Sequence, residues 1–188
     1  MSSESAHFLV GAALSLAAIR SRELTTVLPV WIIPVSCGLL ATVPDLDLVW
    51  SHVFGPVHSN VLRHRGLFHS PFFLILAAGG LAGIVMRNQS KRAFAWLWLL
   101  WAVCMLTHPL LDALTTGGRG VMLLAPFTTA RFHFPWQPLQ MASEGEDLLH
   151  RAWLLRWSEV PFCAAAAAIG AAGLFARRPG LNTGQMLD

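Results

Sequence analysis

Hydrophobic residues gather in five long stretches along the chain, at about residues 6–19, 27–43, 67–86, 93–114 and 160–176. At about 1.5 Å per residue, the last four stretches reach most or all of a hydrocarbon core of roughly 30 Å. The first stretch spans such a core only if its helix runs from Ser5 to Arg20 or Arg22, whose long side chains can snorkel to the interface. The pattern predicts an all-α, polytopic membrane helix bundle with about five transmembrane helices, built as a single domain over residues 1–188.

A further helical pattern precedes the last apolar stretch. Ser143 and Glu146 have the spacing of a capping box, in which each side chain bonds the backbone near the other. Hydrophobic residues then recur at helical spacing: Leu148, Leu149, Ala152, Trp153 and Leu155. We therefore expect an interfacial amphipathic helix, which together with the last transmembrane helix occupies residues 143–178. Packing of this helix against the bundle is an equal alternative.

The composition excludes an ordinary soluble domain. Of 188 residues, 55% are hydrophobic and only 12% are charged, whereas soluble domains average roughly 25% charged residues. The net charge of +3 comes from basic residues scattered through connectors, so the sequence predicts no nucleic-acid partner. Cys37, Cys104 and Cys163 each lie inside an apolar run without CxxC spacing, and we interpret them as core residues rather than as disulfide partners.

Basic residues in the short connectors predict the orientation. They follow the first, third and fifth stretches: Arg20, Arg22, Arg87, Lys91, Arg92, Arg177 and Arg178. With five crossings these groups share one face, which the positive-inside bias makes cytoplasmic. The N-terminus and the loops at residues 44–66 and 115–159 then lie on the extracytoplasmic side. We expect a multi-pass protein of the cytoplasmic membrane.

Seven ionisable residues stand at the predicted outer ends of the apolar stretches: His7, Asp45, Asp47, His64, His69, His108 and Asp112. A charge or an imidazole at such a position is costly unless it is paired, solvated or bound to a metal ion. Four neighbouring helices would bring all seven into one cluster near the outer membrane surface. The sequence therefore predicts a metal site there.

Each motif also has a simpler explanation. Asp45 and Asp47 follow Pro44 and can serve as turn formers, and a lone His7 can be an ordinary interfacial histidine. His108 and Asp112 share a helix face, which fits two ligands of one ion or a buried hydrogen-bonded pair. His64 and His69 are five residues apart, so both face one ion only if the backbone is irregular at Gly66. The convergence of four such motifs on one face favours the metal site.

The ligand types indicate the ion. Imidazole and carboxylate groups together suit Zn²⁺, Mn²⁺ or Fe²⁺, and no thiolate belongs to the set. Four histidines and three aspartates are too many for one tetrahedral Zn²⁺, so we expect two or more divalent ions, with zinc preferred. Ion pairs of this kind hydrolyse phosphate esters by activating water and neutralising charge on the phosphoryl oxygens.

These motifs resemble a known family. His7, the PDxD loop at Asp45, HRGLFHS at His64, HPLLD at His108 and the TxxGxxLLxPF stretch that follows are similar to the YdjM-like family of bacterial membrane-bound metal-dependent hydrolases. The resemblance covers residues 7–136. That family is grouped with zinc-dependent phospholipase C, which implies a helical fold, several zinc ions and phosphodiesterase-like or phospholipase-like hydrolysis. It also implies that the seven residues are the ligands, in a bacterial inner membrane.

Two arginines are candidates for holding a phosphate group, because a guanidinium pairs two anionic oxygens at once. They are Arg65, inside the HRG motif, and Arg131. For Arg65 the alternative is an ion pair with Asp45 or Asp47, and for Arg131 it is contact with lipid headgroups. We assign catalytic roles to Asp47 and Arg65. The other histidines lack a second ligand type at helical spacing: His52, His58, His133 and His150.

The sequence thus predicts a membrane-bound metal-dependent hydrolase that cleaves a phosphoester in a phospholipid or lipid-linked substrate, with membrane lipids as partners. One alternative is a divalent-metal or proton transporter that uses the His/Asp cluster. It is disfavoured because no repeated halves are evident and the polar residues crowd one face. Another is a scaffold in which the metal only fixes the helices.

Overall fold

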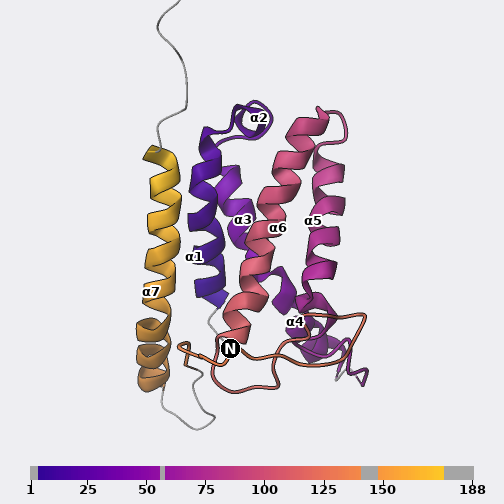
Figure 1. Cartoon of the computed structure of the whole chain (residues 1–188), viewed down its shortest axis with the longest axis vertical. Coiled ribbons are helices and arrows are strands. Elements are labelled where there is room, and N and C mark those ends of the chain that lie inside the picture. Colours follow the sequence, from indigo (N-terminus) through magenta and orange to yellow (C-terminus); the bar gives the residue numbers. More distant parts are fainter. Residues whose placement is uncertain (1–3, 56–57, 141–147, 176–188) are drawn as a thin grey trace, which may run out of the picture.

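The computed structural model describes residues 4–55, 58–140 and 148–175, and within these ranges it is helical, with two isolated β-bridges and no strand. Five helices run along the long axis of the molecule (Figure 1): α1 (Glu4–Leu14), α3 (Ile32–Thr42), α5 (Pro71–Val85), α6 (Lys91–Ala113) and α7 (Leu148–Phe175). Short helices join them: η1 (Ser15–Arg20), α2 (Arg22–Thr25), η2 (Val43–Asp45), α4 (Leu46–Phe54) and η3 (Leu67–His69). The predicted all-α bundle is confirmed.

Small residues let the helices approach closely. α1 packs between α3 and α7, while α6 packs against α1, α3 and α5. A Cβ on Gly11 of α1 would stand 2.7 Å from both the Ala41 Cβ and the Cys37 carbonyl oxygen of α3. Close approach at small residues is typical of membrane helices, whose association depends on van der Waals packing rather than on the hydrophobic effect.

Three helical segments are long and apolar enough to cross a membrane: Ile32–Phe54, which combines α3, η2 and α4, Lys91–Ala113 and Trp157–Phe175. α5 has 15 residues and α1 has 11, and both fall short of the roughly 20 residues that a crossing needs. Large hydrophobic side chains are exposed on the flanks, such as Ile84 at 71% and Phe54 at 69%. The protein is membrane-embedded, and the crossing of all five helices stays a prediction.

The expected division of residues 143–178 into two helices differs from the structure. The described part forms one continuous helix, α7, from Leu148 to Phe175, and the capping-box residues Ser143 and Glu146 lie outside the described ranges. Pro161 lies inside α7, where its missing N–H removes one backbone hydrogen bond but does not end the helix. The amphipathic pattern therefore belongs to the first turns of the last long helix.

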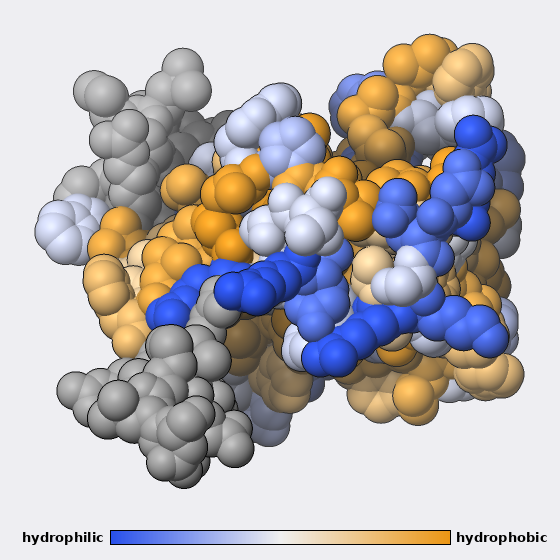
Figure 2. Space-filling model, turned by 90° about the horizontal axis from the view of Figure 1, so that it is seen from above, coloured by the Kyte–Doolittle hydropathy of each residue, from blue (hydrophilic) through white to orange (hydrophobic). Residues whose placement is uncertain are grey.

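The two ends of the bundle differ in character. The beginning of α1, α4 and the loops after α4 and α6 lie at one end, whereas α2, the α5–α6 turn and the end of α7 lie at the other (Figure 1). The connectors with Arg20, Arg22 and Arg87 therefore share one end, as predicted from five alternating segments. Hydrophilic side chains run across this end, and hydrophobic ones surround much of them (Figure 2).

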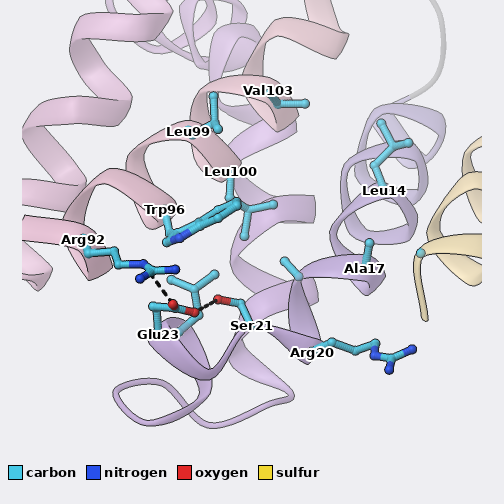
Figure 3. Close-up of a pocket in the computed structure, with 13 residues that line it drawn as sticks. Leu14, Ala17, Arg20, Ser21, Glu23, Arg92, Trp96, Leu99, Leu100 and Val103 are labelled. Carbon is cyan, nitrogen blue, oxygen red and sulfur yellow. Dashed lines mark hydrogen bonds and ion pairs between the residues drawn. The ribbon is translucent and has the colours of Figure 1, made fainter. Parts of the chain in front are cut away.

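An ion pair ties α2 to α6 at this end. Arg92 Nε lies 3.0 Å from Glu23 Oε1, and Ser21 Oγ donates a hydrogen bond of 3.0 Å to Glu23 Oε2 (Figure 3). These groups border a cavity of about 850 Å³ that is lined otherwise by side chains such as Leu14, Trp96 and Leu99. Within the described residues, none of the seven predicted metal ligands lines this cavity.

Candidate metal centre

Four ligand-type side chains from three segments meet at the α4 end of the bundle. Asp45 ends η2, His69 ends η3, and His108 and Asp112 lie one turn apart on α6. All four are buried, with exposures of 5% or less. One potential ligand atom from each lies within 4.8 Å of the others. The structure thus brings together residues that are as many as 67 positions apart in the chain.

The distances in this four-donor group fit one tetrahedral ion. Asp45 Oδ1 lies 3.3 Å from His108 Nε2 and 3.4 Å from His69 Nε2. Asp112 Oδ2 lies 3.5 Å from His69 Nε2 and 3.8 Å from His108 Nε2. Ligands held at about 2.0 Å from a tetrahedral zinc ion are about 3.3 Å apart. These four aspartate–histidine distances are therefore close to the spacing that a zinc ion needs, and all four donor atoms lie within 4.8 Å of one another.

Several of these atoms also lack another partner. Asp45 Oδ1, His69 Nε2 and His108 Nε2 are buried and make no well-aligned hydrogen bond within the described part of the chain. A buried polar atom without a hydrogen bond costs about 1–3 kcal/mol, and native proteins keep few of them. A bound cation would satisfy all three atoms at once, so their convergence supports a metal site.

The backbone of α3 sets the orientation of His108. Its Nδ1–H donates a hydrogen bond of 2.7 Å to the carbonyl oxygen of Ala41. In the neutral ring this bond leaves the lone pair on Nε2, which faces Asp45 and Asp112. Metal-binding histidines commonly hold a carbonyl with their second nitrogen, because this bond orients the ring. This geometry would allow His108 to bind a metal ion through Nε2.

A second group of potential ligands lies next to the first and consists of Asp47, His64 and His69. His64 Nδ1 lies 3.0 Å from Asp47 Oδ1, and His69 Nδ1 lies 3.6 Å from Asp47 Oδ2. With a side-chain exposure of 24%, His64 is the most accessible of the residues that the two groups contain. His64 thus forms the accessible edge of the cluster, while Asp47 and His69 are buried.

The backbone is irregular between His64 and His69, as their common orientation requires. Arg65 has a φ of 62°, in the left-handed region that residues other than glycine seldom adopt. A Cβ on Gly66 would stand 2.1 Å from the Val61 carbonyl oxygen, so only glycine fits there. The two imidazole rings then lie 5.0 Å apart. The expected irregularity at Gly66 is present, and it begins one residue earlier.

His69 is shared by the two groups. Its Nε2 faces Asp45 and Asp112, and its Nδ1 faces Asp47. Burial lowers the pKa of His69, which keeps the ring neutral at pH 7. A neutral imidazole has one lone pair and one N–H. The ring can therefore bind one ion through Nε2 while Nδ1–H points toward Asp47.

His7 lies beside the four-donor group. Its ring stacks on His108 with centroids 3.7 Å apart, and its Nε2 lies 3.8 Å from Asp112 Oδ1. Neither group of potential ligands includes it. Six of the seven predicted ligands thus fall into the two groups, and the seventh packs against one of them. Its role as a ligand stays a prediction.

Arg65 is held by Asp112. Its Nε lies 3.2 Å from Asp112 Oδ2, and its Nη2 donates a hydrogen bond of 3.2 Å to Oδ1. The side chain is 3% exposed. Sequence reasoning considered an ion pair with Asp45 or Asp47, but the partner is the aspartate of α6. The structure therefore gives Arg65 a positioning contact, and its contact with substrate stays a prediction.

The loop after α6 covers the cluster. The Met122 N–H donates a hydrogen bond of 2.9 Å to the Arg65 carbonyl oxygen. Ser70 caps α5 by accepting from the Phe73 N–H at 3.2 Å, and its hydroxyl donates to the Ala125 carbonyl oxygen at 2.7 Å. These bonds connect the loop to the residues on both sides of His69, and so they hold that ligand in place.

Arg131 joins the same loop to the segment that carries His64. Its Nη1 donates to the carbonyl oxygens of Gly120 at 3.0 Å and His64 at 3.3 Å, and its Nη2 donates to that of Asn60 at 3.4 Å. Burial lowers the pKa of Arg131, and three neighbouring cations lower it further: Arg119, Arg63 and Arg65. The positive charges crowd together beside the accessible edge of the cluster, where an anion would relieve their repulsion.

Some elements of the site escaped sequence reasoning. The Ala41 carbonyl and the Ser70 cap act through backbone geometry that residue types do not reveal, although Ser70 before Pro71 is a cap signal. Two of the histidines that we left out have other contacts: His52 bonds the Leu48 carbonyl oxygen, and His133 bonds Gln137. His58 is in neither ligand group, and the side chain of His150 lies outside the described residues.

Comparison with known proteins finds relatives that are described as inner membrane proteins. The sequence profile of the family described as YdjM inner membrane protein matches residues 1–180. Inner membrane protein YbcI of Escherichia coli (strain K12) is 38% identical over 104 residues, which is 55% of this chain and 59% of YbcI. No solved structure matches the chain. Because the profile covers nearly the whole sequence, the chain belongs to the YdjM family of inner membrane proteins.

Proposed function

We propose that the protein is a membrane-bound, metal-dependent hydrolase that cleaves a phosphoester in a phospholipid or lipid-linked substrate. The observation that carries this proposal is the four-donor group of Asp45, His69, His108 and Asp112, whose facing atoms are 3.3–3.8 Å apart. Two imidazoles and two carboxylates suit zinc, and no cysteine belongs to either group of potential ligands.

We infer two ions of unequal affinity. The four-donor group supplies a complete, buried ligand set for the first. Asp47 and His64 supply fewer ligands for a second, at the accessible edge, where positions remain open for substrate. Closed ligand sets are typical of structural sites and open ones of catalytic sites. The first ion therefore organises the cluster, and the reaction belongs to the outer edge.

The residues at the outer edge have the chemistry for hydrolysis. When bound, divalent ions activate water for attack and neutralise charge on phosphoryl oxygens. Asp47 Oδ1 faces His64, whereas Asp47 Oδ2 is buried and makes no hydrogen bond within the described residues. Asp47 Oδ2 accepts a proton from the attacking water while the water oxygen forms a bond to phosphorus. The bond from phosphorus to the leaving oxygen breaks, and that oxygen then receives the proton.

The placement of the cluster favours an enzyme over a transporter. Both groups of potential ligands in the described residues lie at the α4 end of the bundle. An ion path would need polar residues that continue toward the opposite end. The cavity at that end is lined mainly by apolar side chains, and its polar residues, Arg20, Ser21, Glu23 and Arg92, belong to neither group of potential ligands. Potential ligands that are confined to one end of the bundle fit a hydrolase better than an ion path.

We further propose that all five long helices cross the inner membrane and that the cluster faces the extracytoplasmic side. α1, α3, α5, α6 and α7 lie side by side and alternate in direction along the chain (Figure 1). α1 continues through η1 to Arg20, which lengthens its path. The basic connectors share the end opposite the cluster, and such residues mark the cytoplasmic face.

Elemental analysis combined with a substrate screen tests this function. The purified protein is analysed for zinc, manganese and iron, and is then incubated with phospholipids and lipid-linked diphosphates while products are identified by mass spectrometry. We expect one to two zinc ions per chain and turnover that Asp47→Asn abolishes, with His52→Ala as the control. Bound metal without turnover of any of these substrates would argue against the hydrolase, and the scaffold and the transporter would remain as functions. Uptake of zinc into vesicles would then identify the transporter.

A further inference from the structure

An apolar groove on the flank of the bundle ends at the metal centre. It lies between η2–α4 and α5 and has a volume of about 510 Å³, within the range of small-molecule sites. Leu46 and Trp50 line one wall and are exposed at 58% and 59%. These side chains lie on candidate span Ile32–Phe54, so their exposed apolar surface suits contact with the hydrocarbon of the membrane.

The other wall is one face of α5. Phe73, Ala77 and Leu81 are each four residues apart and line the groove, and Met105 of α6 lies beneath it. The three positions extend along about 12 Å of helix. Ala77, in the middle, has the smallest side chain of the three, so it leaves space for a ligand at the centre of the groove. These lining positions follow the axis of α5, which runs along the long axis of the molecule, as hydrocarbon chains would run in a bilayer crossed by this helix.

Asp47 is the charged residue of this groove, and it belongs to the second group of potential ligands. The deeper ligands are closed off, since His69 and His108 are both 0% exposed. The accessible ligand is His64, with a side-chain exposure of 24%, and its Nδ1 lies 3.0 Å from Oδ1 of Asp47, the residue that lines the groove. A molecule lying in the groove would reach the cluster without leaving the membrane.

Charge at this end complements an anionic group. Leu62 lines the groove, and Arg63 follows it in the chain. Arg63, Arg65 and Arg119 are all close enough to Arg131 to lower its pKa. Arg65 is paired with Asp112, whereas Arg131 bonds the His64 carbonyl oxygen at 3.3 Å and brings positive charge to the accessible edge. A hydrocarbon channel that ends at cations and metal ligands matches a molecule with an apolar chain and a phosphate at its end.

We infer that the groove holds one hydrocarbon chain of a membrane phospholipid, which enters sideways from the bilayer and presents its phosphate at Asp47 and His64. Its hydrolysis rests on the proposed function, but binding of the chain does not. The groove would thus select substrates by their chain and exclude water-soluble phosphodiesters, which lack the contacts with α5.

Photo-cross-linking tests the inference. The full-length protein is placed in vesicles of phosphatidylethanolamine and phosphatidylglycerol that contain phosphatidylethanolamine with a diazirine on one acyl chain, and labelled residues are mapped by mass spectrometry. We expect labelling of Trp50 and Leu81 to exceed that of Ile84, an exposed residue outside the groove. Ala77→Trp fills the channel and should lower labelling of Trp50 at least fivefold. Leu76→Trp, on the exposed face of α5, should leave it unchanged.

Equal labelling of Trp50 in the two variants, or labelling no denser than at Ile84, would overturn the inference. Ala77→Leu serves as a milder block, with a smaller decrease expected, should the tryptophan variant fail to fold. Turnover is measured separately. Groove-specific labelling without hydrolysis of any phospholipid would support lipid binding in the groove and contradict the proposed hydrolase activity. Hydrolysis with uniform labelling would support the activity and contradict lipid binding in the groove.

Discussion

Arg65 grips the carboxylate of Asp112 with two nitrogens, Nε at 3.2 Å from Oδ2 and Nη2 at 3.2 Å from Oδ1. Asp112 Oδ2 in turn faces His69 and His108. A guanidinium on the outer side of a ligating carboxylate fixes the direction of its lone pairs, which is how outer partners tune metal sites. The buried Arg65 therefore both orients Asp112 and offsets part of the negative charge of the aspartates in the cluster.

Arg65→Lys should weaken metal binding. Lysine keeps the charge but has no planar fork for both carboxylate oxygens, so Asp112 loses its fixed orientation. We expect the zinc Kd to rise about 10–100-fold, measured by competition with a fluorescent chelator. Arg119→Lys, at an exposed position, is the control and should change little. Unchanged affinity with slower turnover would instead assign Arg65 to the substrate, as the sequence-based hypothesis proposed.

His108→Ala and Asp112→Asn should both lose the tightly bound ion. Each removes one donor from the four-donor group, and the remaining three leave an incomplete tetrahedral set. We expect less than about a tenth of the parental zinc content by elemental analysis after gel filtration. His52→Ala should retain it, because His52 bonds only within α4. Full zinc content in both ligand variants would show that the ion lies elsewhere.

Zinc should also stabilise the folded protein. Buried atoms such as Asp45 Oδ1 and His108 Nε2 make no hydrogen bond within the described residues. Burying polar atoms without such bonds destabilises the metal-free protein. Zinc at one hundred times its Kd adds about 2.7 kcal/mol to the free energy of unfolding. A thermal melt in detergent with and without chelator measures this. The His108→Ala protein should melt at the same temperature in both, and a shift equal to that of the parent would contradict the assignment.

The sequence was most informative where the chemistry depends on helical spacing. His108 and Asp112 share a face of α6 because they are four residues apart, and the structure places both in the four-donor group. The apolar stretches at 67–86 and 93–114 located α5 and α6 to within four residues, whereas α7 begins well before the stretch at 160–176. The convergence of Asp45 and His69 on the same point followed from their positions at the ends of such stretches, which a compact bundle must bring together.

Sequence patterns were less informative about the irregular segments. The left-handed backbone of Arg65 cannot be inferred from residue type, because arginine seldom adopts it. The pairing of Arg65 with Asp112 depends on that backbone. The continuity of α7 was missed because a capping-box pattern marks where a helix can begin but not where it ends. The groove beside Asp47 depends on the distance between α4 and α5, which no local pattern encodes.

Gly66→Ala should disrupt the second ligand group. A Cβ there would stand 2.1 Å from the Val61 carbonyl oxygen and 2.5 Å from that of Arg63, so the loop must move and carry His64 away from Asp47. We expect a clear loss of thermal stability and of any second zinc ion. Gly80→Ala is the matched control, because nothing lies within 4 Å of its Cβ, and helix propensity makes it neutral or slightly stabilising. Equal melting temperatures for the two variants would show that the loop adapts.

Single cysteines should report the side of the membrane on which the metal centre lies. Cys37, Cys104 and Cys163 are first replaced, and then Gln89→Cys and His58→Cys are made separately. Both positions are exposed; residue 89 lies in the α5–α6 turn and residue 58 at the opposite end, near the metal centre.

Because Arg87, Lys91 and Arg92 flank the turn, the positive-inside bias keeps it in the cytoplasm. An impermeant thiol reagent should therefore label residue 58 in intact cells and residue 89 only after permeabilisation. Labelling of residue 89 in intact cells with protection of residue 58 would invert the topology, and the cluster, the groove and their substrate would then belong to the cytoplasmic leaflet.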